Sequence, residues 1–347
     1  MKILVVKPKA AIKMDSDVFC EGFERLGHII IEPILEGNNV HLPNKNVDVI
    51  WCPYEQELPL GLAIKQSIDA PIVGHFEWMP PWRTATEDVT NWGYTTDEEI
   101  KKIRDQQKDH IDYYFKLLNL YLRCDRMTTP TRYCLSTIEK LHTFTPEDYA
   151  KIRIKPYIID DRLLSRQKDS TIEEEYAILT IGRLVPHKKI DHIIEALSYI
   201  KNPPKLKILG YGPEKDNIIK LANKLNINIE FVGVGIDGGK ALEIQKSKFL
   251  VTPFTSLPVG EAAIFKKPTI LYNHPNVIQK HGNMGQYVAT DDTTELADAI
   301  RRWLNYPEEA RREGQNSYDK LMSNESGLKT TENACNEMIK IFKEVVK

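Results

Sequence analysis

The sequence has no run of about 20 apolar residues, the length that a helix needs to cross a bilayer. It has no signal-peptide pattern either, because MKILVVKPKAAIKMD holds only a short apolar run before further lysines. The five cysteines are scattered and never in C-x-x-C spacing, which favours reduced thiols over a disulfide framework. No lipidation signal or polybasic helix is present. We therefore expect a cytoplasmic protein with at most peripheral membrane contact.

The sequence also lacks a large charge of one sign. The formal net charge is −2, whereas general nucleic-acid binding depends on neutralising many phosphates, so we expect no nucleic-acid partner. No cluster of residues has metal-ligand spacing, and we expect neither a metal nor a resident cofactor. Hydrophobic residues make up 41% and charged residues 28% of 347. This is an ordinary globular composition at a length that favours two domains.

Short apolar runs alternate with helical patterns along most of the chain, which is typical of β-α-β units around parallel sheets. A polar segment at 160–176 separates two sets of expected strands and is the best candidate for a linker. The expected strands are 3–6, 29–32, 47–52, 72–75, 126–129 and 152–155 in the first set, and 177–181, 206–209, 229–232, 249–252, 269–272 and 287–289 in the second. We predict an α/β protein with two doubly wound, Rossmann-like domains that face a central cleft.

A basic turn opens the second set, in ILTIGRLVPHKKIDHIIEAL at 178–197. The expected strand ends at Gly182, and Arg183, His187, Lys188 and Lys189 follow before a helical pattern begins. A helix N-terminus carries partial positive charge, so added cations repel it unless an anion is bound there. The alternative is a solvated basic turn without a ligand.

Three further features follow expected strands of the same set, and ligands of doubly wound sheets bind beyond the carboxyl ends of the strands. LKILGYGPEKDN contains Gly210 and Gly212, EFVGVGIDGGKA contains Gly233, and FLVTPFTSLPVGEAAIFKKPTILY contains Glu261. Glycines let a ligand approach the backbone, a guanidinium grips phosphate oxygens, and a carboxylate accepts from ribose hydroxyls. Together they describe a pocket for a nucleotide diphosphate. GVGIDG also fits a dinucleotide pattern, but no acidic residue ends the next strand, so a nicotinamide cofactor is unsupported.

GRLVPHKKIDHIIEA, LKILGYGP, IEFVGV and PVGEAAIFKKPTIL stand in the order and spacing of one known family. Over 176–305 the chain resembles retaining glycosyltransferases of the GT-B fold, the glycosyl transferases group 1 (family 4). In the first half, CDRMTTPTRYCLSTIEKL and KIRIKPYIID are similar to segments that end the family's N-terminal domain. The resemblance implies an acceptor-side domain at 1–160, a nucleotide-sugar-binding domain at 161–327, and a C-terminal helix within 328–347 that crosses back.

The resemblance implies a transferase, with a hexosyltransferase expected, that uses a UDP-, GDP- or ADP-sugar as co-substrate, retains the anomeric configuration and needs no metal. The acceptor, a glycan, a lipid or another molecule, is not specified. Arg183 and Lys188 would bind the diphosphate and act in catalysis, and Glu261 would hold the ribose. The full expected donor set is Gly182, Arg183, Lys188, Gly210, Gly212, Gly233, Ser256, Val259, Gly260 and Glu261.

Three departures from the family pattern bear on activity. The family has two glutamates separated by seven residues, and the position of the first is Pro253 here. Backbone amides near 256–260, or Thr255, are the expected substitutes. Lys189 stands where the family has a glycine, and VKPKAAIKMDSD lacks the double glycine that usually follows the first strand.

In the first half, the resemblance extends to His75, which ends an expected strand and would be catalytic near the reaction centre. A structural histidine is the alternative. Trp78 and Trp82, whose faces can stack on sugars, and the cations Lys7 and Lys9 are the expected acceptor-binding residues. The alternatives are aromatic residues that pin a loop to the core and lysines that are merely solvated.

Two other functions stay open at this point. The missing glutamate is compatible with a GT-B-shaped binding or scaffold protein without catalysis, and nucleotide-sugar epimerases share the two-domain architecture.

Overall fold

The computed structural model describes residues 1–8, 15–36, 39–76, 108–139, 142–167, 172–233, 239–254 and 257–346. The chain divides into two compact units. Unit 1 holds the described residues up to Ile158 together with the chain from Thr331 onward, and unit 2 holds Ile159–Thr330. Among the described residues, the chain passes from unit 1 to unit 2 after Ile158 and returns to unit 1 at Thr331.

Unit 1 is built on a parallel six-stranded sheet with the order β2-β1-β5-β6-β7-β8. Its strands are β1 (Lys2–Val5), β2 (Ile29–Ile31), β5 (Val49–Cys52), β6 (Ile72–His75), β7 (Arg126–Thr129) and β8 (Ile152–Ile154). Its helices are α1 (Asp15–Arg25), η1 (Glu55–Glu57), α2 (Leu58–Lys65), α5 (Lys108–Tyr121), α6 (Arg132–Glu139), α7 (Pro146–Lys151) and α16 (Thr331–Lys343). An antiparallel pair, β3 (Ile34–Glu36) and β4 (Asn39–His41), follows β2.

The central strands of unit 1 are buried along their whole length because both faces of the sheet are covered. Every residue of β5 and β6 is buried, as expected for parallel strands between two helical layers. On one face α16 packs against α1, and a Cβ on Gly22 would lie 2.4 Å from Cys335 Sγ. Beyond this helix, Glu344 pairs with Arg126 and Arg153, which fastens the returning chain to β7 and β8.

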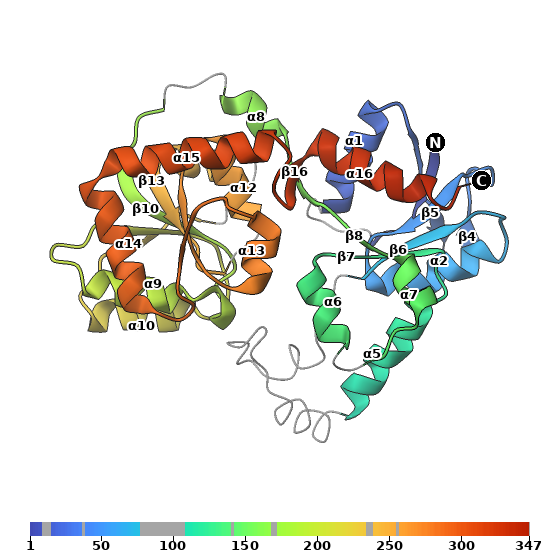
Figure 1. Ribbon diagram of the computed structural model, residues 1–347, viewed down its shortest axis with the longest axis horizontal. Coiled ribbons are helices and arrows are strands. Elements are labelled where there is room, and N and C mark those ends of the chain that lie inside the picture. The colour runs from blue at the N-terminus through green and yellow to red at the C-terminus, as the bar shows by residue number, and fades with distance from the viewer. Residues whose placement is uncertain are drawn as a thin grey trace. The chain divides into compact units, whose positions relative to one another are not determined.

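Unit 2 contains a second parallel six-stranded sheet, with helices on both sides of its strands (Figure 1). Its strands are β10 (Tyr176–Ile181), β11 (Leu206–Leu209), β12 (Ile229–Phe231), β13 (Ser247–Val251), β14 (Thr269–Tyr272) and β15 (Gln286–Val288). Its helices are α8 (Arg162–Gln167), η3 (Pro186–Lys188), α9 (Ile190–Ser198), α10 (Lys215–Lys224), α11 (Gly239–Lys246), α12 (Leu257–Ile264), α13 (Pro275–His281), α14 (Thr293–Asn305) and α15 (Pro307–Met322). Two short strands where the chain passes between the units, β9 (Tyr157–Ile159) and β16 (Leu328–Thr330), form a small sheet.

The strand order of the second sheet fixes where a ligand fits. The order is β12-β11-β10-β13-β14-β15, so the chain winds outward from β10 in one direction and then restarts beside it at β13. This is the doubly wound order whose switch point lies between the first and fourth strands. Ile178 pairs with Phe249 across that point. The loops that follow β10 and β13 therefore flank the crevice.

All twelve strands expected from the sequence are present, with ends shifted by at most a few residues. The four short strands β3, β4, β9 and β16 were not expected. All residues of β3 and β4 are exposed, so the burial pattern that marks the other strands is missing there. Leu328–Thr330, at the start of the C-terminal segment 328–347, forms β16, and the last helix begins at Thr331.

None of the helices in the described ranges is long and apolar enough to span a bilayer.

Candidate functional site

The loops after β10 and β11 are packed backbone to backbone. A Cβ on Gly210 would lie 1.9 Å from the carbonyl oxygen of Gly182, and one on Gly212 would lie 2.3 Å from that of Leu184. The Leu184 amide donates to the Tyr211 carbonyl at 2.8 Å. We expected these glycines to admit a ligand, and the structure shows that Gly210 and Gly212 are needed to fit the two loops together.

Lys188 spans the switch point. It ends η3, in the loop after β10, and its Nζ donates to the carbonyl oxygen of Phe254, in the loop after β13, at 3.0 Å. Its aliphatic stem passes over Gly182, where a Cβ would lie 3.7–3.9 Å from the stem carbons. Lys188 therefore lies beyond the carboxyl end of β10, as the sequence predicts, and its ammonium group reaches the β13 side of the switch point.

Arg183 is the first residue after Gly182, and its side chain is exposed. Among the residues that the structure describes, its guanidinium has no hydrogen-bond or ion-pair partner. A planar guanidinium next to a crevice can take phosphate oxygens in a bidentate arrangement without first breaking an internal ion pair.

Glu261 is a buried carboxylate on α12, the helix that follows the loop after β13. Its side chain is 8% exposed, and Oε1 forms an ion pair with Lys240 of α11. Oε2 is buried and has no hydrogen-bond partner among the residues that the structure describes. An unsatisfied buried acceptor is costly, so a ligand hydroxyl that donates to Oε2 would remove a penalty that the free protein carries. Lys240 was not identified from the sequence, where a lysine after two glycines gives no signal of this contact.

Two other expected donor residues belong to α12. Val259 is buried, and a Cβ on Gly260 would lie 2.6 Å from Ile159 Cδ1, so Gly260 lets α12 pack closely on the segment that enters unit 2. Gly233, after β12, has φ +94° and open space around its Cβ position. Ser256 lies outside the described residues.

Lys189 joins η3 to α9 in the left-handed region, with φ 54° and ψ 40°. That conformation costs an L-residue about 1–2 kcal/mol and is free for glycine. The backbone therefore gives a physical reason for the glycine that the family has here, although this chain carries lysine.

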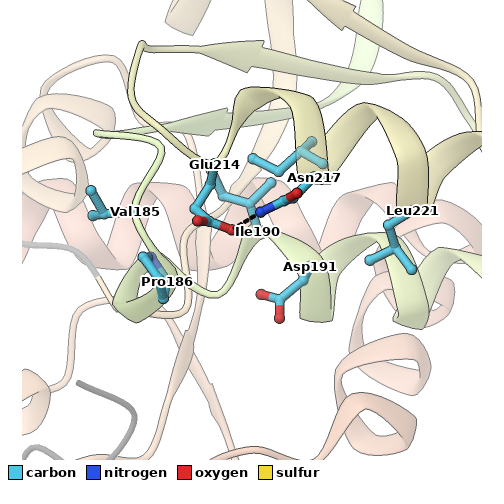
Figure 2. A pocket seen from close by; sticks show the side chains of 8 residues that line it. Val185, Pro186, Ile190, Asp191, Glu214, Asn217 and Leu221 are labelled. Atoms are coloured by element: carbon cyan, nitrogen blue, oxygen red, sulfur yellow. Dashed lines mark hydrogen bonds between the residues drawn. The ribbon is translucent and has the colours of Figure 1, made fainter. Parts of the chain in front are cut away.

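A cavity of about 280 Å³ lies between η3, the start of α9 and the start of α10. Asp191 and Glu214 are among the residues that line it, and Asn217 Nδ2 donates to Glu214 Oε2 at 3.1 Å (Figure 2). The two carboxylates lie in the first turn of α9 and at the N-cap of α10, where they complement the helix dipoles. They disfavour a bound phosphate, and none of the expected site residues lines this cavity.

His75 ends β6 in unit 1. It is 2% exposed, and its Nδ1 lies 2.9 Å from Thr128 Oγ1. Burial, with the positive charge of Lys155, lowers the pKa of His75 well below its usual 6.5. The imidazole is therefore neutral at pH 7, a form that can accept a proton or a hydrogen bond. Its catalytic role stays a prediction.

The lowered pKa of His75 predicts a specific pH dependence of stability. Below about pH 6.5 the unfolded chain protonates this residue while the folded chain does not, so the free energy of unfolding falls as the pH falls, by up to about 1.4 kcal/mol per pH unit. His75→Asn, which keeps a polar group near Thr128, should be less stable than wild type at pH 8 but should lose less stability between pH 6.5 and 5. Urea unfolding at several pH values measures this. Parallel stability curves for the two proteins would show that His75 does not titrate in this way.

The expected acceptor residues are only partly described. Lys7 is paired with Asp17 and with Glu32, the latter at 3.0 Å. Burial lowers the pKa of Lys7, but the hydrogen bonds to these carboxylates outweigh it and raise the pKa. Lys7 is therefore charged but held by its own unit. Lys9, Trp78 and Trp82 lie outside the described residues, and the acceptor site stays a prediction.

The family match covers nearly the same residues as unit 2. Residues 161–320 match the family described as Glycosyl transferases group 1. An uncharacterized glycosyltransferase of Haemophilus influenzae is 27% identical over 215 residues, which are 59% of this chain and 58% of that protein. The match thus spans somewhat over half the length of this curated relative.

Solved structures match over nearly the whole chain. Anabaena HepE in complex with UDP aligns with a TM-score of 0.68 at 12% identity, over 99% of both chains. Sucrose-phosphate synthase from Thermosynechococcus elongatus aligns with a TM-score of 0.69 at 15% identity, over 99% of this chain and 98% of that one. At such identities the likeness shows the fold alone. The protein has the α/β fold of two Rossmann-like units found in GT-B glycosyltransferases, and the family match over 161–320 supports a glycosyltransferase function.

Proposed function

We propose that this protein transfers a sugar, a hexose by preference, from a nucleotide-diphosphate donor to an acceptor hydroxyl, with retention of configuration and without a metal. The observation that carries the proposal is the arrangement around the loop after β13. Lys188 reaches that loop from β10, and Glu261, with one unsatisfied buried oxygen, lies on the helix that follows it. A cation for phosphates and an acceptor for ribose hydroxyls are the two groups that a nucleoside diphosphate needs.

The chemistry requires positive charge where the leaving group forms. The bond between the anomeric carbon and the diphosphate oxygen breaks, the acceptor oxygen bonds to that carbon, and the acceptor proton passes to the departing diphosphate. Arg183 and Lys188 stabilise the negative charge that develops on the diphosphate. Removing one such fixed donor typically slows a reaction by about 100- to 1,000-fold.

A nucleotide-binding protein without catalysis is the second candidate, and Pro253 favours it. Proline stands where the resemblance has the glutamate that contacts the donor sugar, and it is buried, with its carbonyl accepting from the Tyr272 amide at 3.2 Å. Under the leading proposal, backbone amides at the start of α12 take the place of that carboxylate.

Incubation with UDP-, GDP- and ADP-sugars, with and without candidate acceptors and EDTA, separates the alternatives. We expect nucleotide release that depends on acceptor and continues in EDTA. A changed sugar still attached to nucleotide would indicate an epimerase instead. Nucleotide binding without turnover under every condition would favour the binding protein.

A further inference from the structure

Lys188 and Lys189 are consecutive, but their side chains go to different parts of unit 2. Lys188 Nζ lies on the Phe254 carbonyl, in the loop after β13. Lys189 Nζ lies 3.3 Å from Asp291 Oδ1, in the loop after β15. The backbone of Lys189 is left-handed and separates the two side-chain directions. Its amide also donates a hydrogen bond to the Pro186 carbonyl at 3.0 Å, which closes η3.

The contact between Lys189 and Asp291 joins a buried lysine to a carboxylate that is 41% exposed. The Lys189 side chain is 7% exposed, and a buried ammonium group needs a paired carboxylate. Asp291 also has a left-handed backbone, with φ 62°. His192 of α9 lies nearby, its Nδ1 2.7 Å from Tyr272 Oη and 3.7 Å from Asp291 Oδ1. The start of α9 is thus tied to the ends of β14 and β15.

Strained backbones persist only where the surroundings hold them, and they concentrate at functional sites. We propose that Lys189 is a positioning residue of the donor site: its ion pair with Asp291 holds the left-handed turn that aims Lys188 at the diphosphate. This inference rests on the proposed function, because it assumes that Lys188 binds that group. In this chain the ion pair stabilises the left-handed turn, whereas a glycine at the same position adopts that conformation without such support.

Binding of UDP to the Lys189→Met and Asp291→Asn variants tests whether breaking the ion pair weakens or strengthens nucleotide binding. If the ion pair positions Lys188, each substitution weakens UDP binding by about 3- to 10-fold. If Lys189 and Asp291 act only through their charge, removing the negative Asp291 strengthens binding of the anion. Tighter or unchanged binding by Asp291→Asn therefore overturns the proposal. Lys189→Gly, which suits the left-handed backbone without an ion pair, should bind UDP more tightly than Lys189→Met. If the methionine variant does not fold, Asp291→Asn keeps the test valid.

A double-mutant cycle separates positioning from a general loss of stability. In a Lys188→Ala background, Lys189→Met should cause no further loss of UDP affinity, because the group that it positions is absent. An equal loss in both backgrounds overturns the proposal, as does a lower melting temperature with unchanged affinity. Lys266→Met is the matched control, since Lys266 is an exposed left-handed lysine in the same unit and should leave UDP affinity unchanged. If the wild type binds none of UDP, GDP and ADP, the proposed function fails, whereas these variant results on a binding wild type test positioning alone.

Discussion

Lys188→Ala is expected to weaken binding of the preferred nucleoside diphosphate by about 10- to 150-fold, because a charge-assisted contact contributes about 1.5–3 kcal/mol. The effect should be large for a single lysine, since Lys188 Nζ is held at the switch point by the Phe254 carbonyl at 3.0 Å and does not have to be ordered on binding. Isothermal titration with UDP, GDP and ADP measures the change. Arg183→Ala should act in the same direction.

Lys205→Ala is the matched control for this loss of charge. Lys205 immediately precedes β11 and pairs with Glu230 at 3.0 Å, so it lies at the edge of the sheet opposite the carboxyl ends. The Lys205→Ala substitution removes the same charge from the same unit as Lys188→Ala. It should leave the affinity for the nucleoside diphosphate within about twofold of wild type, since exposed ion pairs contribute little. Equal nucleotide affinity of Lys188→Ala and wild type would contradict the assignment of Lys188 to the site. Equal losses of affinity in Lys188→Ala and Lys205→Ala would show that only the net charge of the unit matters.

Gly210→Ala should be strongly destabilising. The added Cβ would lie 1.9 Å from the Gly182 carbonyl oxygen and 3.0 Å from its carbon, so backbone rather than a flexible side chain must move. We expect a loss of about 3 kcal/mol or more, which for a unit of this size lowers the melting temperature by roughly 6–12 °C. The same shift displaces the loop that carries Arg183, so UDP binding should fall as well.

Gly239→Ala gives the comparison for that prediction. Gly239 begins α11, and none of the described residues places a heavy atom within 4 Å of its Cβ position. Alanine there should change stability by less than about 0.5 kcal/mol. If the Gly210→Ala and Gly239→Ala proteins had the same melting temperature, the close approach of the two loops would not be required for stability.

The sheets were predictable because their strands carry strong local signals. The runs at 72–75, 126–129, 206–209 and 269–272 are strands with those same bounds. Most of their residues are buried, as expected for parallel strands that are covered on both faces. The hairpin of β3 and β4 gave no such signal because its side chains are exposed. The doubly wound class of the sheets followed from the alternation of strands and helices, which admits few topologies.

The site was predictable only where charge stands next to a strand end. Arg183, Lys188 and Glu261 could be picked out because each follows an apolar run in the sequence. Contacts that join distant segments gave no signal. Lys240 meets Glu261 across 21 residues and Lys189 meets Asp291 across about 100, and these pairings follow from how the helices pack over the sheet.

The glycines illustrate the same limit in another way. Gly210 and Gly212 were correctly placed after a strand, but a glycine that admits a ligand and one that admits a neighbouring backbone look identical in a sequence. The 1.9 Å and 2.3 Å approaches to Gly182 and Leu184 distinguish them.

A crystal structure of the protein with UDP, or with whichever nucleoside diphosphate binds most tightly, tests the central claim most directly. The account predicts diphosphate oxygens within hydrogen-bond distance of Lys188 Nζ and the Arg183 guanidinium, and a ribose hydroxyl on Glu261 Oε2. A nucleotide bound elsewhere, or bound beyond β10 and β13 with both basic side chains turned away from it, would contradict the account.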